Sequence, residues 1–577
     1  MQLPKTVLER FEAAADSEFA SQPLPHPNAH VAAWYLLTVS EDAQRILLVN
    51  PYNSLDERRI EYFLDRYKFS LRQCLMAVRA KAHDRTAIPL PANVVPALYE
   101  RTHSLLAAGI DYSVVAQICS SAHTGSSRVV DKADGYAVEL DEQLLDKRYG
   151  VLELMRQSAS EPVIPYSAVL WFWIQNSEEV PIAVHQLAQR TRISRRRIQY
   201  AFEPQLSYQL AQSLTQLPFL VPDGWRFPWG GRQETTLLLN ALSLRIVYHL
   251  SAVHFGAIKY GLKGGAESDL CLCIEREQLV HDIALNSSLE LSRIRSFVDY
   301  LTYGRGVDSP DQALQPIVPL GAKRLAIAGI GFLSSNAERN LLTLQARLEP
   351  NLFDSQSSVF EVEMTRSLQS ALAQRWERVA ANRRFQLGET NEELDLLVCE
   401  PESRTVLVLE LRWMLSPADP REVHTKRRTC YQKVDQVKRK VAAASANLPR
   451  LLRVAFDIAL EPSDEWNVCG AVVVQGFGGA LSQQEQIPVI PDWVFEAGVR
   501  KAPTLKCLAE WMKSLDWLPV EGRDFEVREK AELLSIKIRH GGIVPKRAGR
   551  EYLEDATCTL SDILAQDVRL PLNEQRN

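Results

Sequence analysis

The sequence has little of what would place it at once among membrane, secreted or zinc-binding proteins. Its most apolar run, residues 163–174, is shorter than the roughly 20 apolar residues that a membrane-spanning helix needs. The residues after Met1 lack the apolar core of a signal peptide. The nine cysteines are scattered, and the closest pair, Cys271 and Cys273, lacks the spacing of a zinc knuckle. We therefore expect a cytoplasmic protein with reduced thiols and no membrane partner.

The sequence also lacks a strong excess of one charge. Its 577 residues carry a formal net charge of -5, with 46% hydrophobic and 24% charged residues, as in folded globular proteins. Such a chain has no global positive field, so any surface for nucleic acid must be local. The length predicts several domains. Changes of pattern suggest two helical domains over 1–175 and 176–350, an α/β domain over 351–500 and a C-terminal extension over 501–577.

The hydrophobic pattern divides the chain into two halves. Up to about residue 345, apolar residues recur at three- and four-residue spacing, which predicts a mostly helical half. Beyond it the sequence predicts, in order, a helix over about 359–379, strands over 394–399 and 405–411, a basic helix over about 420–446 and a strand over 468–475. The order α, β, β, α, β is typical of a mixed sheet flanked by helices.

Two acidic residues interrupt the apolar strands of this second half. Asp395 lies within Leu394–Cys399, and Glu410 lies near the end of the next strand. A carboxylate placed there costs several kcal/mol unless it is paired, solvated or bound to metal. Carboxylate oxygens are the ligands that a hard cation such as Mg²⁺ prefers. Strand alternation puts Arg412 on the same face as Glu410, so a simple ion pair is the alternative interpretation.

The helix that follows these strands is strongly basic. Two acidic residues stand against eight lysines and arginines: Arg421, Lys426, Arg427, Arg428, Lys433, Lys438, Arg439 and Lys440. On an acidic protein this local excess indicates contact with backbone phosphates. A solvated helix face is the alternative.

Three stretches together, 388–398, 407–413 and 431–438, resemble the PD-(D/E)XK superfamily, whose restriction-endonuclease-like fold is shared by many restriction, repair and phage-defence nucleases. The resemblance implies an α/β restriction-endonuclease-like domain with a mixed central sheet. It implies a metal-dependent DNA endonuclease that uses Mg²⁺ or Mn²⁺ and acts on DNA, duplex rather than single-stranded. A phage-defence or DNA-processing effector is the role that it suggests. Partner proteins or a homo-oligomer are compatible with it.

The family pattern can be carried over residue by residue. Asp395 and Glu410 match the strand carboxylates, and Glu361, with Glu363 in reserve, matches the glutamate of the preceding helix. These three would hold the metal, and Gln432 would complete the catalytic set. Lys433, Lys438 and Lys440 would contact nucleic acid.

One residue departs from the family pattern, because Arg412 stands where the family usually has lysine. A guanidinium can stabilise phosphate charge but cannot accept a proton. Arg412 would then act by its charge alone, or a lysine of the basic helix (Lys433, Lys438 or Lys440) would reach the site. The remaining alternative is a catalytically inactive nuclease-fold subunit that binds DNA or serves as a scaffold.

The helical half contains a segment, residues 184–202, that resembles a helix-turn-helix. Its apolar residues would pack two helices together, and Ser194 would cap the second. Arg195, Arg196 and Arg197 would then begin a recognition helix that contacts DNA. Purely structural packing is the alternative. A second stretch, 279–301, has similar spacing but a less basic second helix, which favours a structural role.

Overall fold

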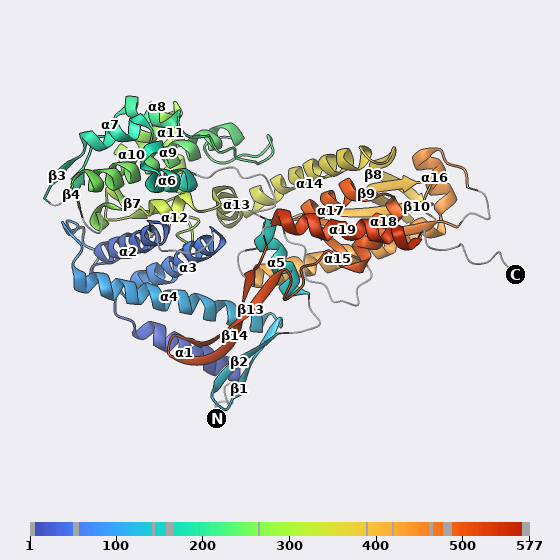
Figure 1. Cartoon of the computed structure of the whole chain (residues 1–577), viewed down its shortest axis with the longest axis horizontal. Helices are drawn as coiled ribbons and strands as arrows, with labels where there is room; N and C mark the ends of the chain where they lie inside the picture. Colours follow the sequence, from blue (N-terminus) through green and yellow to red (C-terminus); the bar gives the residue numbers. More distant parts are fainter. Residues whose placement is uncertain are drawn as a thin grey trace.

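The computed structural model describes residues 6–49, 57–140, 145–156, 166–195, 197–262, 266–387, 390–417, 420–460, 465–476, 487–547 and 549–567. This part of the chain forms 19 α-helices and several sheets. The amino-terminal half is mainly helical and the longer strands lie in the carboxyl-terminal part, as the sequence predicts. Figure 1 shows the two parts side by side, with α14 reaching from one toward the other.

Four helices open the chain: α1 (Val7–Ser21), α2 (Ala29–Val49), α3 (Glu57–Lys81) and α4 (Pro96–His123). The helices α2, α3 and α4 pack around a common apolar cluster that includes Trp34, Leu71 and Leu105. The approach of α4 to α3 is close, because a Cβ at Gly109 would lie 2.6 Å from the Ser70 hydroxyl. The fold therefore needs a glycine at this crossing.

The next part of the chain surrounds one long helix, α9 (Arg232–Lys259). The helices α6 (Tyr166–Gln175), α7 (Ile182–Arg190), α8 (Pro204–Ala211), α10 (Arg276–Ser287) and α12 (Gly329–Leu333) contact it. Two further helices of this part are α11 (Leu291–Tyr300), which packs on α10, and α13 (Ala337–Leu348). The helix α5 (Asp146–Arg156) lies instead against elements from the end of the chain. Short 3-10 turns cover Ser177–Glu179 and Glu267–Asp269, and a small sheet joins β5 (Leu272–Glu275), β7 (Arg324–Ile327) and β6 (Ile317–Pro319).

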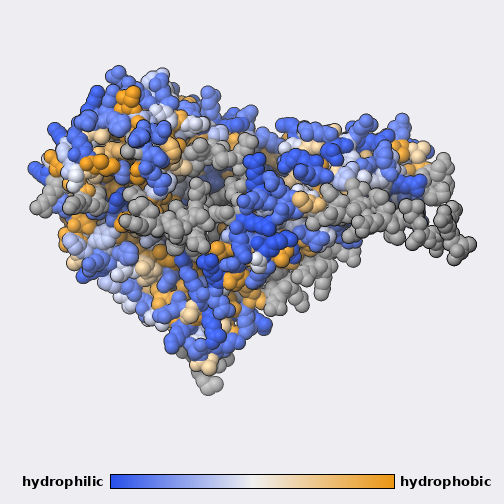
Figure 2. Space-filling view, in the orientation of Figure 1, coloured by the Kyte–Doolittle hydropathy of each residue, from blue (hydrophilic) through white to orange (hydrophobic). Residues whose placement is uncertain are grey.

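Among the described residues two helices, α4 and α9, are long and apolar enough to cross a membrane by length and composition alone. In α9 the apolar stretch is 83% buried inside the protein. A core helix surrounded by other helices is apolar all round for the same reason. On the described part of the face in Figure 2, apolar residues are scattered among hydrophilic ones.

The predicted helix-turn-helix over 184–202 is wrong in its second half. The first helix is α7, but the chain then forms a hairpin of β3 (Arg192–Ser194) and β4 (Arg197–Gln199), with Arg195 in its turn. Tertiary contacts hold these residues extended, because Ile198 is buried in a cluster with residues of α9 and its backbone N–H donates to Asp269. Arg196 lies outside the described residues. The stretch 279–301 does contain two helices, α10 and α11, joined by a short turn.

The carboxyl-terminal part is built on a five-stranded mixed sheet in the order β12-β11-β10-β9-β8. Its elements are α14 (Pro350–Ala373), β8 (Arg378–Leu387), β9 (Thr390–Glu400), β10 (Thr405–Trp413), α15 (Pro420–Ala446), α16 (Leu448–Phe456), β11 (Asn467–Gln475) and β12 (Val489–Pro491). The strands β8, β9 and β10 are antiparallel neighbours, whereas β10, β11 and β12 run parallel. A mixed sheet flanked by helices is therefore confirmed.

Two strands of this sheet were not predicted, the short β12 and the edge strand β8. The helix expected to reach about residue 379 ends at Ala373, and β8 begins at Arg378. Its sequence carries three arginines and lacks a regular apolar alternation. At the edge of the sheet β8 pairs with β9 alone, so cross-strand hydrogen bonds, rather than burial on both faces, hold it in place.

The last elements join both parts of the molecule. Helices α17 (Asp492–Lys501), α18 (Leu505–Ser514) and α19 (Gly549–Asp567) pack together, and α17 and α18 contact the five-stranded sheet. The hairpin of β13 (Phe525–Leu533) and β14 (Ile536–Pro545) extends an amino-terminal hairpin, β1 (Ser127–Lys132) and β2 (Gly135–Leu140), into the sheet β1-β2-β14-β13. Residues far apart in sequence thus share one sheet (Figure 1).

Candidate carboxylate site between the central sheet and α15

The central strand β10 places Glu410 on the face covered by α15. Leu409 and Leu411 belong to the large core shared with α14, whereas Val408 lies in the smaller cluster shared with the end of α15 and α16. Because side chains alternate along a strand, Glu410 faces the same side as Val408. Its side chain is only 4% exposed. A carboxylate so deeply buried requires charged or hydrogen-bonding partners.

Two lysines of α15 supply these partners. The Lys433 ammonium donates to one oxygen of Glu410 at 2.6 Å, and the Lys440 ammonium donates to the other. Seven residues separate the two lysines, so they lie on the same side of the helix two turns apart. Lys440 is 8% exposed and Lys433 is 20% exposed. Lys433 is therefore the lysine nearer to solvent.

Asp395 enters the same site from the neighbouring strand β9. Its Oδ2 accepts a hydrogen bond of 2.8 Å from the backbone N–H of Leu411. Burial and the nearby negative charge of Glu410 raise the pKa of Asp395 to about 6, against the favourable Leu411 hydrogen bond and the charges of Lys440 and Lys433. Two carboxylates that repel each other in this way form a site where added positive charge is stabilising.

Arg412 and Glu361 form a separate ion pair beside this site. The guanidinium of Arg412 donates to Glu361 of α14 at 2.6 Å. The side chains of Arg412 and Glu361 are 41% and 34% exposed. Nearby, the Phe360 and Trp413 rings stack with centroids 4.0 Å apart, which fixes α14 against the end of β10. The alternative interpretation, an ion pair between Arg412 and Glu410, is wrong, because Arg412 pairs with Glu361 and Glu410 is bound by the two lysines.

The other predicted site residues divide into those the fold brings together and those it does not. Asp395, Glu410, Lys433 and Lys440 meet, with both lysines on Glu410, and a role of either lysine in the site stays a prediction. Gln432 and Lys438 are exposed on α15, and Glu363 is exposed on α14. Within the described ranges no group of three acidic, histidine or cysteine side chains is arranged to hold a metal, so Glu361 does not join Asp395 and Glu410.

Sequence reasoning missed one member of this region. Glu392, three residues before Asp395 on β9, is buried and accepts a hydrogen bond of 3.0 Å from Arg439 of α15. Its only signal was a second acidic residue in an apolar strand. Together Asp395, Glu392 and Glu410 give the sheet a row of acidic groups, and α15 covers two of them with basic side chains.

The residue set fits a hard divalent cation. Asp395 and Glu410 provide carboxylate oxygens, and Mg²⁺ commonly binds one or two carboxylates and keeps several waters. Asp395 Oδ1 accepts no hydrogen bond from the described residues. Both oxygens of Glu410 are taken by ammonium groups, so a cation would replace one of them.

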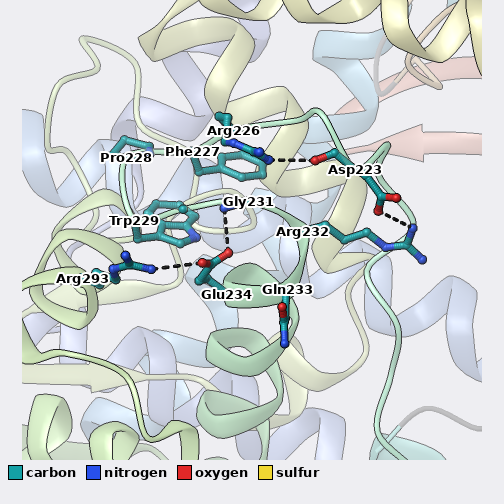
Figure 3. A pocket seen from close by; sticks show the side chains of 11 residues that line it. Asp223, Arg226, Phe227, Pro228, Trp229, Gly231, Arg232, Gln233, Glu234 and Arg293 are labelled. Carbon is teal, nitrogen blue, oxygen red and sulfur yellow. Dashed lines mark hydrogen bonds and ion pairs between the residues drawn. The ribbon is translucent and has the colours of Figure 1, made fainter.

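A separate cleft lies at the amino-terminal end of α9 and is lined by none of these residues. It has a volume of about 600 Å³ and surrounds the amino-terminal end of α9, with Arg226, Arg232 and Arg293 in its walls (Figure 3). Arg232 pairs with Asp223 and Arg293 pairs with Glu234, whereas Arg226 donates to the backbone carbonyls of Asp223 and Trp225. Glu234 also accepts a hydrogen bond from the N–H of Gly231. Its carboxylate therefore already supplies the negative charge that the amino-terminal end of a helix favours.

No family model, curated protein or solved structure gives a significant match to this chain.

Proposed function

We propose that the protein is a metal-dependent DNA endonuclease whose site consists of Asp395, Glu410 and Lys433. The observation that carries the proposal is the meeting of two carboxylates from adjacent strands with a lysine of the next helix. The order α14, β8, β9, β10, α15, β11 around a mixed sheet supports the resemblance to the PD-(D/E)XK nucleases. The resemblance alone suggests a role in phage defence or DNA processing.

Asp395 and Glu410 would hold one Mg²⁺ or Mn²⁺, which polarises the phosphate and activates a water. Glu361 would remain on Arg412 rather than bind the metal. Water oxygen attacks phosphorus while the bond from phosphorus to the leaving oxygen breaks, and the water proton must be accepted nearby. A lysine amine can accept it, whereas the guanidinium of Arg412 cannot. Displaced from Glu410 by the cation, the partly exposed Lys433 would be placed for this role as a neutral amine, and the buried Lys440 would keep Glu410 in position.

The exposed side of α15 would hold the DNA next to this site. Lys438 and Arg439 are exposed about one and a half turns beyond Lys433, and Gln432 is exposed beside it. Arg412, which is 41% exposed at the end of β10, would contact the phosphate under attack. Contacts of this kind position a backbone without reading its sequence.

The first experiment separates the amine of Lys433 from its charge. In Lys433→Arg the cation that pairs with Glu410 is kept, but the proton acceptor is lost. We expect plasmid cleavage by the full chain in Mn²⁺ to fall by about 10² or more, the usual contribution of a positioned acid or base. Lys513→Arg, the same change at an exposed lysine of α18 outside the site, is the matched control and should cleave like the unchanged protein.

Arg412→Lys tests the other possible source of the amine. If Lys433 supplies it, this variant cleaves no faster than the unchanged protein, whereas a large gain would move the role to position 412. Intact supercoiled and linear DNA after incubation of the unchanged protein with Mn²⁺, together with no Mn²⁺ binding in titration calorimetry, would overturn the proposal.

One observation favours a second candidate, a catalytically inactive subunit that binds DNA or serves as a scaffold. Glu410 already has an ammonium on each oxygen, so the cluster is complete as a buried ion network without a metal. In that case Asp395→Ala leaves the biological effect of the protein unchanged.

A further inference from the structure

The hairpin β3–β4 projects from the helical part of the molecule and is rigidly anchored. Ile198 packs on α9 beside Gly256, where a Cβ would lie 3.2 Å from the Ile198 methyl group. Asp269 accepts the backbone N–H of Ile198 at 2.7 Å. At the base of the hairpin, Tyr260 donates to the carbonyl of Thr191 at 2.6 Å, and Lys259 donates to the same carbonyl. The fold thus fixes where the tip of this hairpin points.

The arginines of this segment divide into two kinds. Arg190 pairs with Glu203 and Arg197 pairs with Asp269, so these two hold the hairpin to the protein. Arg192 and Arg195 are exposed, and within the described residues neither side chain forms an ion pair or hydrogen bond. Two unmatched positive charges therefore remain on the strand and the turn of a rigid hairpin.

The turn of the hairpin places Arg195 in a backbone conformation that other residue types adopt at lower energy. Arg195 has φ of 51°, in the left-handed region, and two-residue hairpin turns of this kind prefer Asn, Asp or Gly. An arginine there costs conformational energy, and its side chain forms no ion pair or hydrogen bond with the described residues. Its cationic side chain thus offers no evident gain to the folded chain alone.

We propose that the hairpin β3–β4 is an anchor for the backbone of duplex DNA, with Arg192 and Arg195 each on a phosphate. A polyanion is the partner that matches two unpaired guanidinium groups on a rigid support. Binding of single strands relies on exposed aromatic rings that stack on bases. The ring that follows β4, Tyr200, points inward, with its hydroxyl 2.7 Å from His249. The anchor therefore grips the backbone and reads no bases.

This inference is independent of the cleavage chemistry. The hairpin lies near one end of the molecule and β9 and β10 lie near the other (Figure 1). A duplex held at the hairpin would be bound whether or not Asp395 and Glu410 hold a metal. The two proposals therefore fail separately.

The test is the salt dependence of binding to a 40-base-pair duplex, measured by fluorescence anisotropy with the full chain in EDTA, which prevents cleavage. The slope of log K against log salt is negative, and each lost phosphate contact lowers its magnitude by about 0.9. We expect Arg192→Gln with Arg195→Gln to lower the slope by about 1.8 and to weaken binding by at least tenfold at 0.1 M salt.

The matched control removes two arginines of similar exposure that are already paired. Arg293 and Arg295 of α11 bind Glu234 and Glu277, so Arg293→Gln with Arg295→Gln changes the net charge equally and should leave the slope unchanged. Equal slopes for the hairpin variant and the unchanged protein would overturn the anchor. So would an equal loss in both variants, or tighter binding of the single strand than of the duplex.

Discussion

At the residue scale, the carboxylate site is a balance of buried charges. Glu410 is satisfied by two ammonium groups, but Asp395 has one backbone hydrogen bond and a like charge beside it. Its pKa of about 6 lies above the ordinary 3.8. The folded protein therefore retains this proton to higher pH than the unfolded chain does. The stabilisation that the protonated Asp395 provides is complete below pH 3.8 and is lost as the pH rises through about 6.

Asp395→Asn should remove this pH dependence. We expect the variant to match the unchanged protein at pH 4 and to exceed its free energy of unfolding by about 1–3 kcal/mol at pH 8, as the size of the pKa shift implies. Urea unfolding at both pH values measures the difference. A variant that is less stable at pH 8 would show that Asp395 is held by favourable charges instead.

At the element scale, the site depends on how closely α15 approaches the sheet. A Cβ at Gly470 of β11 would lie 2.6 Å from a methyl group of Val441 and still closer to Val437. Both valines are on α15, between and beyond the two lysines that reach Glu410. The absence of a side chain on one strand therefore positions the lysines over its neighbour.

Gly470→Ala should move α15 away from the sheet. We expect a loss of about 1–3 kcal/mol in stability, as for other overpacked cores, and a loss of cleavage that exceeds what the fall in folded fraction explains. Gly150→Ala in α5 is the control, because no atom lies within 4 Å of its added Cβ. In a helix that change should stabilise the protein by up to about 1 kcal/mol. Thermal unfolding compares the two variants.

At the scale of the whole molecule, the carboxyl-terminal hairpin ties distant parts together. Leu533 and Ile538 are buried in one cluster with Phe11 of α1 and Val115 of α4. Tyr149 of α5 likewise donates to the carbonyl of Val489 in β12 at 2.8 Å. The segments predicted as 1–175, 351–500 and 501–577 thus share strands, clusters and hydrogen bonds.

Ile538→Ala should destabilise the amino-terminal helices although it lies near the other end of the chain. Removing a buried isoleucine costs about 2–5 kcal/mol, and amide hydrogen exchange should become faster in α1 and α4. Lys537→Ala, an exposed neighbour, should change stability by less than about 0.5 kcal/mol. Faster exchange confined to β13 and β14 would contradict this coupling.

Sequence reasoning worked best where the pattern was local. Strands β9 and β10, the basic helix α15 and strand β11 lie where the alternation and spacing of apolar residues predict them. It failed where distant residues decide the conformation. Strand β8 depends on its pairing with β9, and β4 depends on α9 and Asp269, so neither has a strong local pattern.

The sequence by itself determined the helical and mixed-sheet halves, and it marked Asp395 and Glu410 as carboxylates that need an explanation in an apolar strand. Only the tertiary structure decided their partners. Lys433 and Lys440 lie more than twenty residues beyond Glu410, and the packing of α15 on Gly470 brings them to it. Likewise, because Ile198 is buried against α9, the segment predicted as a recognition helix forms a hairpin. Two arginines of this hairpin have no ion pair within the described residues. The local sequence pattern shows which residues are buried and therefore where an unpaired charge would cost free energy. Which charges pair depends on which distant elements of the chain meet.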